Sequence, residues 1–188
     1  MAYDLTDWYW AAPDDAKHVF SSKRAEIVPL DDSDFLLWLE DETHILGRMT
    51  DWFTIYNLLI PVMTPKLYAA IIPHLTPSQL FGIKLLLGLT VTFTSHPDLS
   101  GTYALDQSSQ FSIMGVVVGI NAGTGFPLGQ PTLTWMDTTG HPHVFSTPEL
   151  FTSLAVAMRN YIAALNYTWG VLESGGSAPW PPSTVTIP

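Results

Sequence analysis

The spacing of apolar and polar residues changes several times along the chain, and each spacing predicts a different kind of element. Near the N-terminus, short runs of aromatic and β-branched residues between Pro and Asp clusters predict strands at 7–10, 17–22 and 26–29. Asp31, Asp32 and Asp34 then precede the apolar run 35–39, which predicts a short helix with Asp at its N-cap. Residues 1–49 are therefore expected to form a small β-rich module with one short helix.

Residues 50–89 show helical spacing in pieces, and prolines interrupt it at positions 61, 65, 73 and 77. Thr76 followed by Pro77 is typical of a helix start, so a helix is predicted from Pro77 to about Leu87, with Gly88 just beyond its end. This segment is expected to be a helical connector between two domains.

Residues 90–172 are expected to form a C-terminal α+β domain. Period-two alternation predicts a strand at 90–95, and Asp106 is a suitable cap for a helix that reaches about Ala122. A turn that contains Gly140 joins two predicted hairpin strands, 132–136 and 141–145. Ser146 or Thr147 caps a long helix whose expected end is Gly170. The fold class predicted for the whole chain is α+β.

The last segment, 173–188, combines a Gly/Ser linker with a tail that contains four prolines. A disordered tail is one interpretation of this composition. Trp180, Val185 and Ile187 are apolar anchors, however, and they favour an extended arm that docks on another surface.

Two of the predicted helices carry faces suited to packing against another chain. The helix after Asp106 has small residues at alternating spacings of four and three, which lets another backbone approach closely: Ser108, Ser112, Gly115, Gly119 and Ala122. The long helix has a very wide apolar face, which predicts that it is covered on two sides. We therefore predict the following partner-binding residues: Trp180, Val185, Ile187, Ser112, Gly115, Gly119, Phe151, Met158, Ile162 and Trp169.

Charge is scarce and unevenly placed. The 188 residues include 17 acidic and 7 basic side chains, and the first 51 residues hold 12 of the acids and 4 of the bases. Residues 52–188 therefore carry few charges for a free domain surface, which favours burial of that surface in a larger assembly. A surface of neutral polar groups is the alternative. The net charge of -10 argues against nucleic acid and anionic lipid as partners.

Several classes of protein are excluded or disfavoured by what the chain lacks. It has no cysteine, which excludes disulfides, thiolate catalysis and Cys-type metal sites. Its apolar runs are too short or too interrupted for the roughly 20 residues of a membrane-spanning helix. The N-terminus shows no basic leader before an apolar segment, so neither a signal peptide nor membrane insertion is expected.

No motif predicts catalysis or a cofactor. His141 and His143 alternate on a predicted strand, so both rings are expected on one side, with Asp137 across the turn. Two imidazoles and a carboxylate could hold a metal, but a solvated hairpin face is favoured. A glycosidase needs two carboxylates, and the chain has enough candidates in Asp106, Asp137 and Glu149. No pattern supports a catalytic role, however, because Asp106 and Glu149 are already explained as helix-capping residues. The glycine-containing loops lack the Lys that follows the glycines in a phosphate-binding loop. The acidic cluster before Phe35 lacks the regular spacing of oxygen ligands that a calcium-binding loop requires. We expect a non-enzyme without a cofactor, and a metal site shared between subunits at the two histidines stays open.

Two stretches resemble known proteins. Trp8-Tyr9-Trp10, Val19 to Arg24, Ile27-Val28-Pro29, Asp32, Phe35 and Trp38-Leu39 resemble the opening module of short proteins from tailed-bacteriophage and prophage structural gene regions. Residues 101–106, the hairpin stretch 134–140, and His143-Val144-Phe145 followed by Phe151 and the helix 155–165 look like an uncharacterised domain found beside phage tail fibre genes. The resemblance implies a virion component or an assembly factor near the tail, and it supplies no catalytic residue.

These observations predict a bacteriophage virion structural protein that acts through protein–protein assembly, as a tail fibre, adaptor or baseplate-associated subunit. The expected partners are other virion tail proteins and further copies of the chain, with no nucleic acid and no membrane insertion. The expected location is the tail region of the virion, after synthesis in the bacterial host cytoplasm. A tail fibre assembly chaperone and a capsid decoration protein are the alternatives.

Overall fold

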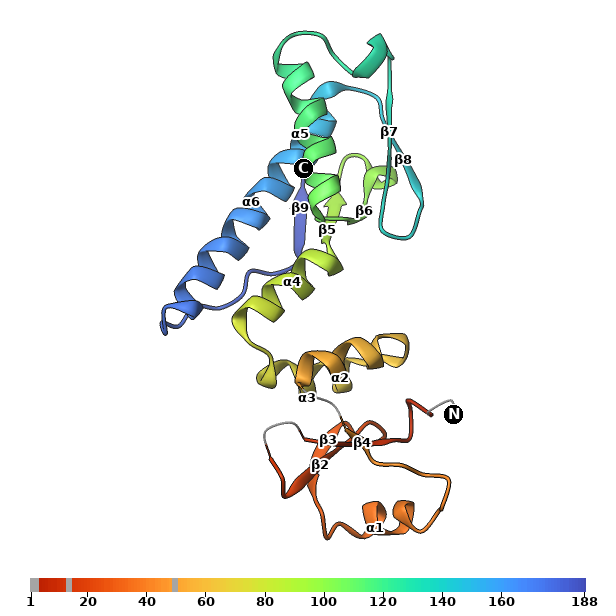
Figure 1. Ribbon diagram of the computed structural model, residues 1–188. Coiled ribbons are helices and arrows are strands. Elements are labelled where there is room, and N and C mark those ends of the chain that lie inside the picture. Colours follow the sequence, from red (N-terminus) through yellow and green to blue (C-terminus); the bar gives the residue numbers. More distant parts are fainter. Residues whose placement is uncertain (1–3, 13–14, 49–50) are drawn as a thin grey trace. The chain divides into compact units, whose positions relative to one another are not determined.

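The computed structural model describes residues 4–12, 15–48 and 51–188, and the chain divides into two compact units at Thr76 and Pro77. Both units combine helices with small separate sheets, so the fold class is α+β, as predicted (Figure 1). No helix in the described residues combines the length and the apolar character needed to span a bilayer.

The first unit, Met1–Thr76, is built on a four-stranded sheet of order β3-β2-β1-β4. Its strands are β1 (Tyr9–Ala11), β2 (His18–Ser21), β3 (Glu26–Pro29) and β4 (Gly47–Arg48). The first three pair antiparallel, which confirms the strands expected there, and β4 joins β1 in parallel. The Pro13-Asp14-Asp15 stretch, whose composition predicts a turn between the first two strands, lies partly outside the described residues. Helix α1 (Ser33–Leu39) has the expected cap, since Asp32 accepts a hydrogen bond from the Phe35 backbone N–H.

Aromatic side chains make up much of the core of this unit. Trp10 is fully buried, and Gly47 on the neighbouring strand lies so close to its indole that a Cβ there would be 2.1 Å from the ring, a space that only glycine leaves open. Helices α2 (Trp52–Leu59) and α3 (Pro65–Ile71) follow, each ending in a 3₁₀ turn that contains a proline. The segment predicted as a connector is therefore divided, because α2 and α3 belong to the first unit and the next helix to the second.

The second unit, Pro77–Pro188, contains a three-stranded sheet of order β6-β5-β9. The central strand β5 (Leu89–Phe93) pairs antiparallel with β6 (Gly101–Tyr103) and parallel with β9 (Thr184–Ile187). A separate hairpin, β7 (Leu133–Met136) and β8 (Pro142–Phe145), turns as predicted, with Gly140 at a positive φ of 82°. Short 3₁₀ turns at Pro97–Leu99 and Pro127–Gly129 complete the connections.

Three helices surround these strands: α4 (Pro77–Leu87), α5 (Gln107–Asn121) and α6 (Pro148–Glu173). The expected caps are present at α5, where Asp106 accepts from the Ser109 N–H, and at α6, where Thr147 is the N-cap. The prediction that α6 ends at Gly170 is wrong, because the helix continues to Glu173. A glycine inside a helix costs only about 1 kcal/mol, so it does not by itself end the helix.

The C-terminal tail docks on its own chain. Strand β9 pairs with β5 over four residues, from Thr90 with Thr184 to Phe93 with Ile187. Trp180, Val185 and Ile187 pack against the core cluster of the second unit. The tail is therefore an ordered edge strand, and its apolar anchors have partners within the chain.

Candidate functional site

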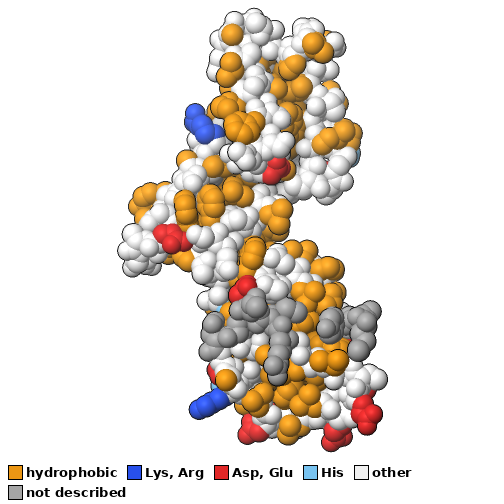
Figure 2. All heavy atoms as spheres, viewed as in Figure 1, with side chains coloured by type: hydrophobic (Ala, Val, Ile, Leu, Met, Phe, Trp, Pro, Cys, Tyr) orange, Lys and Arg blue, Asp and Glu red, His pale blue; other side chains and the backbone are white. Residues whose placement is uncertain are grey.

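An apolar groove lies between α5 and α6. It encloses about 470 Å³, and Gln107, Gln110 and Arg159 are among its few polar lining residues. Its apolar lining comes from both helices: Phe111, Ile113, Met114, Val117, Ala155, Val156, Met158 and Ile162. The space-filling view shows hydrophobic and uncharged atoms over much of the region that α5 and α6 occupy (Figure 2).

The groove continues onto the outer side of α5, where large apolar side chains are exposed in the described structure. Phe111, Met114 and Val118 are exposed by 59%, 55% and 61%. Gly115 lies between them, and a Cβ added there would meet no atom within 4 Å. We call these four residues the α5 face. Large exposed apolar areas of this kind mark binding surfaces in soluble proteins.

Apolar residues occur on all sides of α5, and this produces both a core contact and an exposed face. Ile113 is buried, while Val116, Val117 and Ile120 pack partly against the core cluster. The remaining apolar side chains therefore point away from the core. No residue from Gln107 to Asn121 is charged, so charge does not oppose contact between this helix and an apolar partner.

The structure places the predicted partner-binding residues in different environments. Met158 and Ile162 line the groove, although Met158 is only 2% exposed and belongs to the core cluster. Ser112 and Gly115 are exposed on α5. Gly119 lies beside the Thr124 side chain. Phe151 is completely buried, so its assignment to a partner surface is corrected: its ring packs against Trp135 and Phe145 of the hairpin.

The other predicted residues contact their own chain. Trp169 stacks on Phe81 of α4, and its indole N–H lies 3.1 Å from both the Ser78 hydroxyl and a Glu173 carboxylate oxygen. Trp180, Val185 and Ile187 belong to the docked tail described above. Their assignment to a separate partner stays a prediction, and in the structure they cover the core of the second unit.

Sequence reasoning missed Phe111, Met114, Val118 and Val156. The signal was present on α5, because positions 111, 114 and 118 repeat with spacings of three and four beside the small residues. The small residues drew attention to the helix without indicating which large ones remain exposed. That depends on which side of α5 the core occupies.

A polar cluster around His143 fixes the β7–β8 hairpin to the three-stranded sheet. The His143 ring is only 2% exposed, and its Nδ1 lies 2.7 Å from the Asp98 carbonyl oxygen, which can only accept. Its Nε2 lies 3.5 Å from Asp137 Oδ2. The Thr138 N–H also donates to the Thr102 carbonyl of β6. The solvated hairpin face favoured from the sequence is therefore wrong for His143, because β6 and the turn before it cover the ring.

Hydrogen bonds hold the Asp137 carboxylate in its charged form. The Thr139 hydroxyl, the backbone N–H groups of His141 and Thr139, and the His143 ring together keep the pKa of Asp137 well below its usual range. Burial raises the pKa of the nearby Tyr103 phenol, whose O–H donates to the Leu99 carbonyl at 2.5 Å. The contacts of this cluster connect the hairpin to β6 and to the turn before it, so they account for these residues as part of the structure of the second unit.

No metal site is found in the described part of the chain. His141 and His143 do lie on the same side of the hairpin, with ring centroids 5.0 Å apart, as the alternation predicts. Across residues 4–12, 15–48 and 51–188, however, no three His, Asp or Glu side chains are grouped so that they could hold a metal ion. The acidic residues before α1 serve the helix instead, since Asp32 caps it and binds Arg24.

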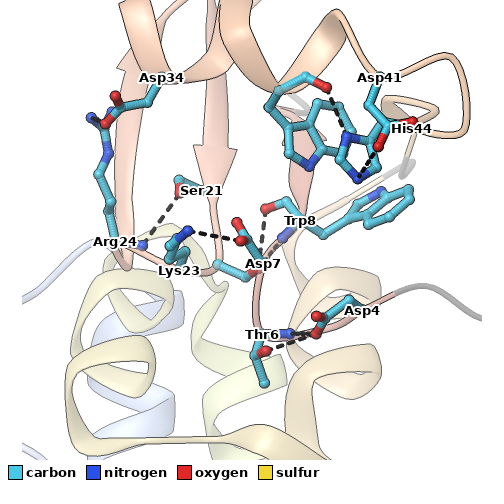
Figure 3. Close-up of polar contacts among 12 residues, drawn as sticks. Asp4, Thr6, Asp7, Trp8, Ser21, Lys23, Arg24, Asp34, Asp41 and His44 are labelled. Carbon is cyan, nitrogen blue, oxygen red and sulfur yellow. Dashed lines mark hydrogen bonds and ion pairs between the residues drawn. The ribbon is translucent and has the colours of Figure 1, made fainter.

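One group of ion pairs in the first unit lies around Arg24. Its guanidinium forms ion pairs with Glu26, Asp32 and Asp34 at 2.8–3.1 Å. Figure 3 shows Arg24 beside Asp34, and Lys23 bound to Asp7 at 2.8 Å. The Arg24 bond lowers the pKa of Asp32. The pairs with Asp32 and Asp34 join Arg24 to the start of α1, and ion pairs at a protein surface typically contribute about 0–1 kcal/mol each.

An aromatic group stabilises the loop that follows α1. The His44 ring stacks on Trp38 with centroids 4.4 Å apart, and its Nδ1 lies 2.7 Å from the Trp38 carbonyl oxygen. The Trp8 indole N–H donates to the Ile45 carbonyl. These contacts account for His44 as part of the structure of the first unit.

Comparisons of the chain with protein-family models, with curated proteins and with solved structures find no match. The α5 face and its groove are therefore assigned from their own geometry. They form an apolar surface feature whose lining residues come from two helices, α5 and α6.

Proposed function

We propose that the chain is a non-enzymatic assembly subunit that binds other protein chains through the α5 face and the α5–α6 groove. The observation that carries this proposal is the exposure of Phe111, Met114 and Val118 beside a groove lined mainly by apolar side chains. Exposing these side chains to water is unfavourable, and cover by a partner would recover roughly 25 cal/mol for each Å² of apolar surface removed from water.

The charge distribution supports the same proposal. Sixteen of the 24 charged residues lie in positions 1–51, whereas α5 and α6 together carry only Glu149, Arg159 and Glu173. Interface cores are depleted of charged residues in the same way. The first unit would then keep the subunit soluble while the second unit makes the contacts.

The proposed setting is the tail of a bacteriophage particle, as a tail fibre, adaptor or baseplate-associated subunit. The sequence resemblance of residues 8–39 and 101–165 supports this setting. The alternative tail fibre chaperone would use the same apolar surface but would leave before the particle is complete.

Two measurements test the proposal. Mass spectrometry of purified particles from a host that carries this gene should find the chain in them; its absence would reject the virion role and favour the chaperone. The groove variant Val156→Asp should reduce incorporation into particles. Tyr167→Asp is the matched control, because Tyr167 is 71% exposed on the same helix and does not line the groove. Equal incorporation of both variants would reject the groove as the contact surface.

A further inference from the structure

The α5 face is nearly self-complementary when the helix direction is reversed. Inverting α5 about the midpoint between Met114 and Gly115 brings Phe111 opposite Val118 and Met114 opposite Gly115. Phe111 and Met114 then each meet a smaller residue of the other copy. The open space at Gly115 accepts the Met114 side chain, because no atom of the same chain lies within 4 Å of a Cβ placed there.

We infer that the occupant of the α5 face is α5 of a second copy of this chain, packed antiparallel around a two-fold axis near Met114 and Gly115. This inference rests on the proposed function and names its partner. A two-fold contact uses the same patch on both chains, which is the commonest symmetry of soluble oligomers. Antiparallel helices also place each positive N-terminal end beside a negative C-terminal end.

Charge favours a second copy over a charged partner. The α5 face has no charged side chain, and among the described residues Arg159 is the one charged residue that lines the groove. A strongly acidic or basic segment would lose its hydration there without an array of opposite charges to compensate. The α5 helix of another copy is uncharged from Gln107 to Asn121 and matches this surface. The acidic excess of the chain lies mostly in residues 1–51, outside the proposed contact.

The spacing of the exposed residues fits a two-helix contact. Phe111, Met114 and Val118 follow the three-and-four spacing with which one helix presents a seam to another. Ser112 and Gly115 beside the seam are small, so the two backbones can approach closely. Two of the residues predicted from sequence as partner-binding thus lie in the proposed interface.

The first test is the mass of the full chain in solution. Sedimentation velocity at up to about 100 µM, a concentration that saturates contacts of micromolar Kd, should show twice the 20.7 kDa of one chain. Gly115→Leu should weaken the dimer about tenfold or more by filling the space that Met114 needs. Gly82→Leu on α4 is the matched control, since Gly82 is also helical, exposed and free of neighbours within 4 Å. A chain that stays monomeric throughout, or equal dimerisation of both variants, would overturn the inference.

The second test uses the absence of natural cysteine to read the helix direction. Under oxidising conditions, Gly115→Cys should form a disulfide-linked dimer, whereas Gly82→Cys should stay monomeric. Ser108→Cys alone should not cross-link, but should do so when mixed with Asn121→Cys. Cross-linking of Ser108→Cys with itself would indicate a parallel pair and reject the antiparallel arrangement.

These outcomes separate the inference from the proposed function. If the chain is monomeric but Val156→Asp still blocks incorporation into particles, the groove binds a different protein and only the inference fails. If the cross-linked dimer forms and Val156→Asp is incorporated normally, the inference stands and the groove-based function fails.

Discussion

Gly101→Ala tests whether the hairpin is fixed to the sheet through His143. A Cβ at this position of β6 would lie 2.8 Å from His143 Nε2 and 3.2 Å from Asp137 Oδ2. The ring cannot move away freely, because it is buried and its Nδ1 donates to the Asp98 carbonyl. The extra methyl group must displace a packed side chain, and such overpacking typically costs about 1–3 kcal/mol.

Urea and thermal unfolding of the full chain measure this cost. We expect Gly101→Ala to lower the melting temperature of the second unit by about 4 °C for each kcal/mol lost. Gly170→Ala is the control, because a Cβ there meets no atom within 4 Å, and it should gain about 1 kcal/mol from helix propensity. In a His143→Ala background the cost of Gly101→Ala should nearly vanish, since the two changes share one contact. An unchanged midpoint for Gly101→Ala, or the same cost in both backgrounds, would refute the packing of His143 against β6.

Two further predictions concern the hairpin turn and the tail. The folded-state pKa of Asp137 is depressed, so the stability that its carboxylate contributes is complete above the unfolded pKa of about 3.9 and is lost as the pH falls towards the folded value. Between about pH 5 and 2, the unfolding midpoint of Asp137→Asn should therefore fall less steeply than that of the unmodified chain. Val185→Asp should destabilise the second unit by about 1–3 kcal/mol in urea titrations, because the carboxylate would face the core without a partner. The control Thr184→Asp, at an exposed position of the same strand, should change the unfolding midpoint little. Equal effects of the two substitutions would show that the tail does not dock.

Local chemistry in the sequence determined most of the element boundaries. Asp32, Asp106 and Thr147 cap helices because their side chains accept from backbone N–H groups only three residues away. The hairpin turn at Gly140 follows in the same way from a positive φ. Patterns of this kind are complete within a few residues, so they can be recognised without knowledge of the rest of the chain.

The candidate site was only partly predictable. The sequence drew attention to α5 through Gly115 and its small neighbours, and to the groove through Met158 and Ile162. It also assigned Phe151 to a partner, whereas the structure buries that ring between hairpin residues. Apolar periodicity shows that a helix face is covered, but it does not show whether the cover comes from the same chain.

The tertiary structure decided every feature that depends on residues far apart in the sequence. Strand β9 lies on β5 although Thr184 and Thr90 are separated by most of the second unit, and no local pattern specifies that pairing. His143 is buried because β6 and the Asp98 turn reach the hairpin, which reverses the exposure expected from its alternating strand. The sequence by itself determined where helices and turns form and where charge is scarce. Only long-range packing decided which apolar residues fill the core and which, as on the α5 face, remain in contact with solvent.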